Sequence, residues 1–104
     1  MRIGDFGQHV EDTFYFLKAE FPGDFDHIAI RIRDLPSPRL KSESVKWAWS
    51  ASHNLLTFYR VPMTYSGRRR DPVDEYLRVD WEIIKALASV TGKDPKNIWD
   101  GPGN

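Results

Sequence analysis

The chain has 104 residues, 40% of them hydrophobic and 29% charged, which is typical of one soluble globular domain. Its 15 basic and 15 acidic residues give a formal net charge of zero, so no overall charge favours nucleic acid or an anionic membrane. The absence of cysteine excludes disulfides and thiolate metal sites. No apolar run suits a membrane helix or a signal peptide, so we expect one cytoplasmic domain over residues 1–104.

The first predicted element is a helix from Asp5 to Glu20, in which Asp5 suits the N-cap position. Five residues at three- and four-residue spacing form its predicted inner face: Phe6, Val10, Thr13, Phe14 and Leu17. Pro22 and Gly23 end the helix. Residues 27–33 then alternate between apolar and mostly polar side chains, which predicts a half-buried strand that ends before Pro36.

A β-hairpin is predicted over residues 45–61. Trp47 and Trp49 lie on one face of its first strand, and His53 and Asn54 suit a tight turn. Residues 55–61 are rich in β-branched and aromatic side chains, and we expect them to form the partner strand. Pro62 should end that strand, because proline cannot donate a ladder hydrogen bond.

The strongest helix signal begins at Pro72, which suits a first helical position after an Asp71 N-cap. Gly92 is expected to end this helix. Its predicted apolar stripe comprises Val73, Tyr76, Leu77, Trp81, Ile84, Leu87 and Ala88. A short turn after Pro95 should let Trp99 dock on the domain. This order predicts an α+β fold, with a small, mostly antiparallel sheet of about three to four strands and two main helices.

Three segments carry a resemblance to a known family. FDHIAIRIRDLPS at residues 25–37 is similar to that family's first strand and its acidic, proline-containing exit. LLTFYRVPM at residues 55–63 is similar to its strand that ends in a Tyr-Arg-x-Pro run. The third segment is the long helix into Gly92, followed by Asp94 and a short turn. Over residues 5–99 the chain therefore resembles the minimal zincins, small bacterial metallopeptidase-like proteins, and this resemblance implies a zincin-like fold.

The chemistry of that family depends on the motif HExxHxxGxxD, in which two histidines bind zinc and the glutamate activates the metal-bound water. When the glycine of the motif is aligned with Gly92, the three catalytic positions fall on Lys85, Ala86 and Ser89. The last acidic position falls on Pro95. A lysine ammonium in place of a ligand would repel a divalent cation, so the resemblance implies a scaffold without that zinc site.

Other candidates for chemistry are isolated residues. An alignment shifted by one turn places Glu82 at the glutamate position, but a solvent-facing ion pair with Lys85 explains Glu82 better. The histidines have no metal-ligand spacing, so only convergence in the fold would make them a site (His9, His27, His53). Three carboxylates near strand ends are expected to serve in turns (Asp24, Asp26, Asp34). We expect no cofactor, with zinc only at an atypical site.

Two groups of residues are candidates for binding a partner. Trp47 and Trp49 either pack beneath a helix or form an exposed aromatic contact surface. Arg68, Arg69 and Arg70 form a basic run that would suit single-stranded nucleic acid, although the acidic residues that follow favour a solvated loop.

The leading hypothesis is a non-catalytic, zincin-like domain that acts as a protein-binding or interaction module. The alternative is a metal-dependent peptidase or hydrolase of the minimal zincin family with an atypical metal site. A third hypothesis is nucleic-acid contact through the arginine run, and the balanced net charge argues against it. The partner, the substrate and the oligomeric state are not specified by the sequence.

Overall fold

Four helices and three strands make up the described part of the chain, which in this computed structural model comprises residues 1–36, 45–64 and 72–99. In chain order they are α1 (Ile3–Glu20), β1 (Ala29–Arg33), β2 (Trp47–Ser50), β3 (Leu55–Tyr59), α2 (Arg60–Thr64), α3 (Pro72–Thr91) and α4 (Pro95–Ile98). The predicted α+β class is confirmed, with α1 and α3 as its two main helices. None of the helices in these residues is long and apolar enough to cross a membrane.

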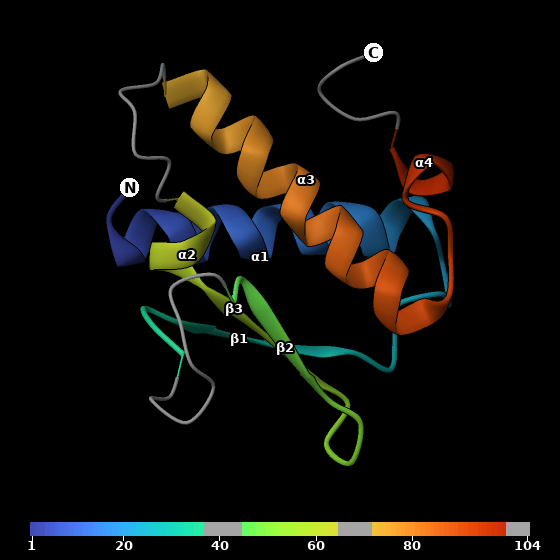
Figure 1. Cartoon of the computed structure of the whole chain (residues 1–104). Helices are drawn as coiled ribbons and strands as arrows, with labels where there is room; N and C mark the ends of the chain where they lie inside the picture. Colours follow the sequence, from blue (N-terminus) through green and yellow to red (C-terminus); the bar gives the residue numbers. More distant parts are fainter. Residues whose placement is uncertain (37–44, 65–71, 100–104) are drawn as a thin grey trace.

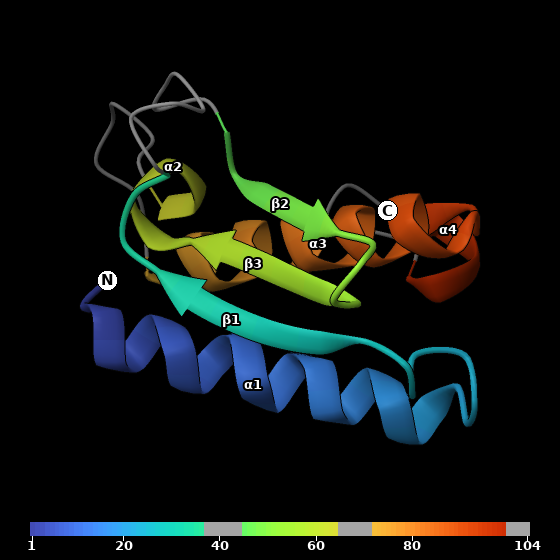
Figure 2. The ribbon, with the colours of Figure 1, turned by 90° about the horizontal axis from the view of Figure 1, so that it is seen from below.

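The strands form one mixed sheet in the order β1-β3-β2. Strand β3 is parallel to β1 and antiparallel to β2, so the prediction of a mostly antiparallel sheet is not confirmed. Strand β3 is central, and four of its five residues are buried, because it has a neighbouring strand on each side. Figure 2 shows β3 between its two neighbours, with α3 behind the sheet and α1 alongside β1.

Helices α1 and α3 cover the same face of the sheet (Figure 1). Ile30 and Ile32 of β1 are in register with Leu56 and Phe58 of β3, and these side chains meet the helices in a single core. The largest fully buried side chains of this core are Phe6, Val10, Phe25, Leu56, Phe58, Met63, Val79, Ile83 and Leu87. Removing this much apolar surface from water is the main stabilising contribution to the fold.

Helix α1 presents the face that its sequence predicts. Its buried residues are Phe6, Val10, Phe14 and Leu17, whereas Thr13 is only half-buried. The helix begins two residues before the predicted start, so Asp5 lies in the first turn instead of at the N-cap. There its carboxylate faces the positive end of the helix dipole. The predicted end is confirmed, and Gly23 has a φ of +87°, which glycine adopts without strain.

Helix α3 has its predicted bounds, and Gly92 ends it with a φ of +77°. The predicted apolar stripe was wrong in part, because Tyr76 is 38% exposed whereas Val79 and Ile83, which the prediction omitted, are fully buried. Since α3 packs against α1 and shares one core with the residues of β3, its buried arc is wider than a single stripe and is centred closer to Val79 and Ile83.

The hairpin is confirmed, but its details differ from the prediction. Residues 51–54 form a four-residue turn in place of the expected two-residue turn, and Asn54 has a φ of +50°, which asparagine tolerates. Strand β3 ends at Tyr59, and the chain continues as the short helix α2 where a strand was predicted up to Val61. Pro62 suits this helix, because a residue in the first turn needs no hydrogen bond from its backbone nitrogen.

The C-terminal turn also follows its prediction. The Asp94 carboxylate accepts a hydrogen bond from the Lys96 backbone N–H at 2.9 Å, which caps α4. Ile98 is buried, and the Trp99 ring meets the Trp81 ring edge-on with centroids 5.9 Å apart. Trp99 therefore docks on the body of the domain, as expected, and helps to form a wall beside α3.

Candidate binding pocket

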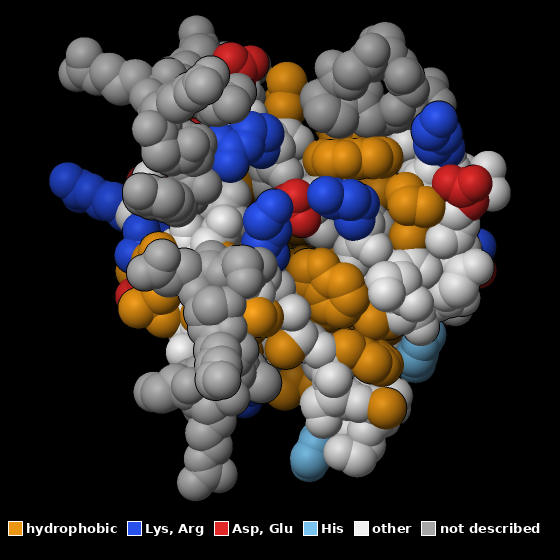
Figure 3. Space-filling model, in the orientation of Figure 1, with side chains coloured by type: hydrophobic (Ala, Val, Ile, Leu, Met, Phe, Trp, Pro, Cys, Tyr) orange, Lys and Arg blue, Asp and Glu red, His pale blue; other side chains and the backbone are white. Residues whose placement is uncertain are grey.

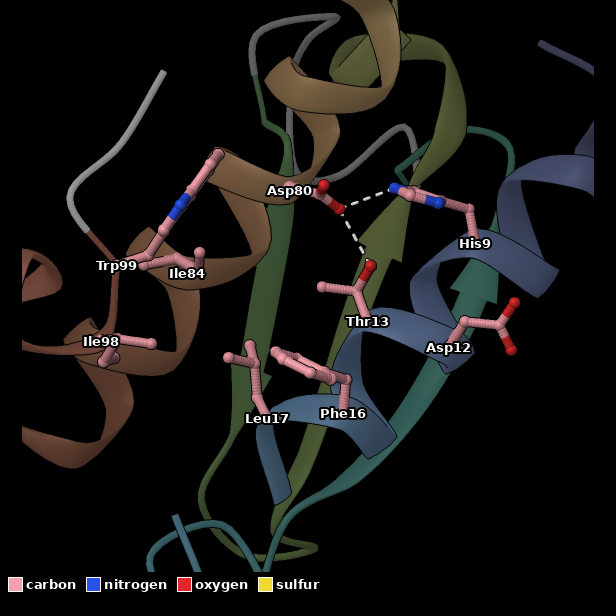
Figure 4. A pocket seen from close by; sticks show the side chains of 9 residues that line it. All are labelled: His9, Asp12, Thr13, Phe16, Leu17, Asp80, Ile84, Ile98 and Trp99. Carbon is pink, nitrogen blue, oxygen red and sulfur yellow. Dashed lines mark hydrogen bonds and ion pairs between the residues drawn. The ribbon is translucent and has the colours of Figure 1, made fainter. Parts of the chain in front are cut away.

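A pocket of about 380 Å³ lies where α1, α3 and α4 meet (Figure 4). Five of its lining residues come from α1, two from α3 and two from the end of the described chain: His9, Asp12, Thr13, Phe16 and Leu17, then Asp80 and Ile84, then Ile98 and Trp99. The pocket thus depends on a helix pair that is distant in sequence and on the α4 turn that closes one side.

The polar end of the pocket is a three-residue cluster centred on Asp80. One carboxylate oxygen, Oδ1, lies 2.6 Å from His9 Nε2 and accepts a hydrogen bond from the Thr13 hydroxyl at 2.9 Å. His9 and Thr13 are four residues apart on α1, so both side chains leave the same helical face toward Asp80 on α3. Figure 4 shows the two contacts converging on this one carboxylate.

The environment of His9 raises the pKa of its imidazole above the usual 6.5. The main cause is the hydrogen bond to Asp80, which favours the protonated ring, and the negative charges of Asp80 and Asp12 act in the same direction. Burial opposes them, because it disfavours the charged form. The net effect is a histidine that holds its proton to higher pH than a free imidazole.

Apart from the exposed Asp12, the rest of the pocket is apolar. Ile84 and Ile98 are buried, and the half-buried Trp99 ring stands beside them. Phe16 forms part of the rim and is 61% exposed, an unusual state for a phenylalanine. The pocket therefore joins a hydrophobic wall to one charged and hydrogen-bonded end, as binding sites commonly do.

The positions aligned with the zinc motif lie outside this pocket and in unlike environments. Ala86 is 0% exposed in the core, whereas Ser89 is exposed and Lys85 forms an ion pair with Glu82. A glutamate in place of Ala86 would enter the core and would not face an open site. Among the described residues, no group of three or more histidine or acidic side chains is placed to hold a metal ion.

Glu82 bridges two lysines. Its Oε1 lies 2.8 Å from Lys85 Nζ and 3.2 Å from Lys46 Nζ, the latter on the chain entering β2. The predicted ion pair with Lys85 is confirmed, but the predicted solvent-facing position was wrong, because the Glu82 side chain is only 12% exposed. Glu82 thus ties α3 to the edge of the sheet and does not resemble a catalytic carboxylate.

The two tryptophans of β2 contribute to the core. Trp47 is paired with Phe58 and Trp49 with Leu56, so both rings share the helix-covered face, where they are half-buried and pack against the core. This arrangement favours the packing interpretation of these residues. Figure 3 shows hydrophobic side chains gathered over α3 and β2, around a small group of acidic and basic ones. The predicted binding residues Arg68, Arg69 and Arg70 lie outside the described residues.

Sequence reasoning missed the His9–Asp80 pair. The other two histidines do not join it: His27 is exposed near the start of β1, and His53 Nδ1 lies 3.1 Å from the hydroxyls of Ser50, at the end of β2, and of Ser52, in the turn. Asp24 and Asp34 form ion pairs with Lys93 and Arg60, which agrees with their predicted structural roles. The one available signal was the four-residue spacing of His9 and Thr13, two polar residues beside the apolar buried face of α1.

Comparisons with protein-family models, with curated proteins and with solved structures find no match to this chain.

Proposed function

We propose that this chain is a non-catalytic interaction domain that docks a segment of a partner protein in the pocket between α1, α3 and α4. The observation that carries the proposal is the exposed Phe16 ring at the rim of an apolar pocket. A small ligand confined to the cavity would cover only the part of this ring that lines the cavity. A protein segment that fills the pocket and also covers its rim would bury the ring, and such aromatic contacts commonly dominate interfaces.

The contacts of the polar cluster favour binding over catalysis. A hydroxyl nucleophile is activated by a hydrogen bond to a general base. Here the Thr13 hydroxyl donates to Asp80 Oδ1, and this same oxygen also contacts His9 Nε2, so the carboxylate that would serve as base already has a competing partner. A metal-dependent hydrolase, the alternative, would need a set of ligands that the described residues do not bring together.

The same proposal includes a zincin-like scaffold that has lost its zinc chemistry. The order of helix, strand, hairpin and helix supports the shared scaffold. Lys85 in place of a histidine, and Ala86 inside the core, support the loss. A cytoplasmic location is also part of the proposal, and the absence of cysteine supports it.

The proposal is tested by selecting short random peptides on the immobilised protein and measuring how the selected peptides bind two matched variants. Phe16→Ser removes the ring at the rim of the pocket. Tyr15→Ser is the control, because the neighbouring Tyr15 ring is 58% exposed but does not line the pocket. Both changes are the same kind of truncation in the same helix, so their effects on helix propensity are similar.

The expected result is a family of peptides that bind the unmodified protein and the Tyr15→Ser variant equally, and bind the Phe16→Ser variant about tenfold more weakly or worse. Equal binding to the two variants would place the contact elsewhere and overturn the proposal. Failure to enrich any peptide sequence would also count against a docking function.

A further inference from the structure

The described residues that line the pocket give it a negative charge. They include two carboxylates, Asp12 and Asp80, and neither lysine nor arginine. The only other ionisable lining group is His9, so the summed charge is negative whether its imidazole is neutral or protonated. An anionic ligand would meet repulsion in either state, whereas a cationic group would be attracted.

The carboxylate of Asp80 has room for one more partner. Its Oδ1 already accepts two hydrogen bonds, from His9 and Thr13. Within the described parts of the chain, its Oδ2 accepts none. Because a carboxylate has about four lone-pair sites, Oδ2 can still accept a hydrogen bond from an N–H group that enters the pocket.

The walls suit a cation that carries an apolar stem. Trp99 and Phe16 supply aromatic rings, on which a flat guanidinium group stacks favourably. Leu17, Ile84 and Ile98 supply an aliphatic surface of the kind that covers the methylene chain of a long basic side chain. Figure 4 shows Trp99, Ile84 and Ile98 on one side of the pocket and Phe16 and Leu17 on another, with the Asp80 carboxylate directed toward His9 and Thr13.

From this arrangement we propose that the pocket takes an arginine side chain of the partner, with its stem against the aliphatic wall and its guanidinium hydrogen-bonded to Asp80. Asp12 also lines the pocket but is exposed and accepts a hydrogen bond from Gln8 at 2.9 Å, so it adds a weaker charge attraction. Arginine fits better than lysine, because its planar guanidinium stacks on rings while one of its N–H groups donates to Asp80 Oδ2, whereas an ammonium is more strongly hydrated. This inference rests on the proposed function and specifies the chemistry of its ligand.

The test is a two-dimensional ¹H–¹⁵N NMR titration with four matched capped tripeptides. Each has leucine on both sides of a central arginine, lysine, citrulline or norleucine. Citrulline has nearly the shape of arginine without its charge. The expected result is that the arginine peptide shifts the amides of His9, Asp80 and Ile84 with a Kd of about 1 mM or tighter. It should bind roughly tenfold more tightly than the citrulline and lysine peptides.

Two charge-removing variants complete the test. Asp80→Asn keeps the shape of the side chain, and its circular dichroism spectrum checks that it folds. Asp12→Asn changes an exposed rim residue, which leaves the fold intact. The advantage of arginine over citrulline should fall about tenfold in Asp80→Asn and about threefold in Asp12→Asn.

The outcomes separate the two proposals. If the citrulline, norleucine or lysine peptide binds at the same amides as tightly as the arginine peptide, the assignment to arginine is overturned and docking in the pocket still stands. If the advantage of arginine persists in both variants, the assignment is likewise overturned, because the carboxylates would not be its partners. If the arginine peptide shifts no amide of the pocket, the assignment fails, and the peptide selection on Phe16→Ser then decides the docking function by itself.

Discussion

His9 Nε2 on α1 lies 2.6 Å from Asp80 Oδ1 on α3, which joins two helices across 71 positions of sequence. The contact is partly shielded from water, with the two side chains only 22% and 25% exposed. Shielding strengthens the attraction between a protonated imidazole and a carboxylate. The pair therefore acts both as a polar link between the two main helices and as the charged end of the pocket.

The first prediction concerns pH and stability. Because the Asp80 hydrogen bond raises the folded-state pKa of His9 above 6.5, folding takes up protons between the unfolded and folded pKa values. The contribution of His9 to stability should be fully present below pH 6.5 and should be lost as pH rises through the raised folded pKa. The free energy of unfolding, measured in urea, should therefore contain a larger His9 contribution at about pH 5.5 than at about pH 8.

The control for this experiment is His9→Gln, whose amide can still donate to Asp80 but does not titrate. The variant should lose less stability than the unmodified protein between the two pH values. An identical change in both proteins would show that other groups cause the pH dependence.

The second prediction concerns Asp80 itself. Asp80→Ala removes the acceptor shared by His9 and Thr13 and leaves two partly buried donors without it. We expect the free energy of unfolding to fall by about 1–3 kcal/mol. The control is Asp24→Ala, which breaks a more exposed ion pair with Lys93 and should cost about 0–1 kcal/mol. Equal losses of stability in the two variants would contradict the conclusion that Asp80 stabilises the fold more than an exposed ion pair does.

The third prediction concerns the bridge made by Glu82. Because this carboxylate contacts both Lys46 and Lys85, removing either lysine leaves the other in place. We expect Lys46→Gln and Lys85→Gln each to cost about 0.5 kcal/mol or less, and Glu82→Gln to cost about 1 kcal/mol. Urea unfolding at low and high salt measures these changes, and a loss in Glu82→Gln that does not shrink with added salt would argue against an electrostatic bridge.

The fourth prediction concerns the positions aligned with the zinc motif. Ala86→Glu places a carboxylate in the core, so we expect it to lower the free energy of unfolding by about 3 kcal/mol or more. Ser89→Glu, at an exposed position three residues later, is the control and should change stability by about 0.5 kcal/mol or less. A well-folded Ala86→Glu protein would show that this position can open to solvent.

Metal analysis of the purified protein examines the same positions independently. We expect no stoichiometric zinc without added metal, since Lys85 would repel the ion at the aligned site. About one equivalent of bound zinc would contradict this expectation and would revive the hydrolase alternative.

The sequence by itself determined most of the local elements, although not the short helix α2. The C-terminal end of α1 and both ends of α3 were predictable because Pro22, Gly23, Pro72 and Gly92 act on the backbone of their own segments. The inner face of α1 and the hairpin were predictable for a similar reason, since hydrophobic spacing and strand alternation are properties of neighbouring residues. The α+β class followed from the order of these elements.

Only the tertiary structure decided how the elements combine. The parallel pairing of β1 with β3 depends on which surfaces compete for the core. The same competition decides which side of α3 is buried, and it places Val79 inward. The approach of His9 to Asp80 depends on the angle at which α1 and α3 pack, and no local pattern encodes that angle. Local sequence fixes backbone conformation within a few residues, whereas the pocket and its charge arise from contacts between segments that are far apart in the chain.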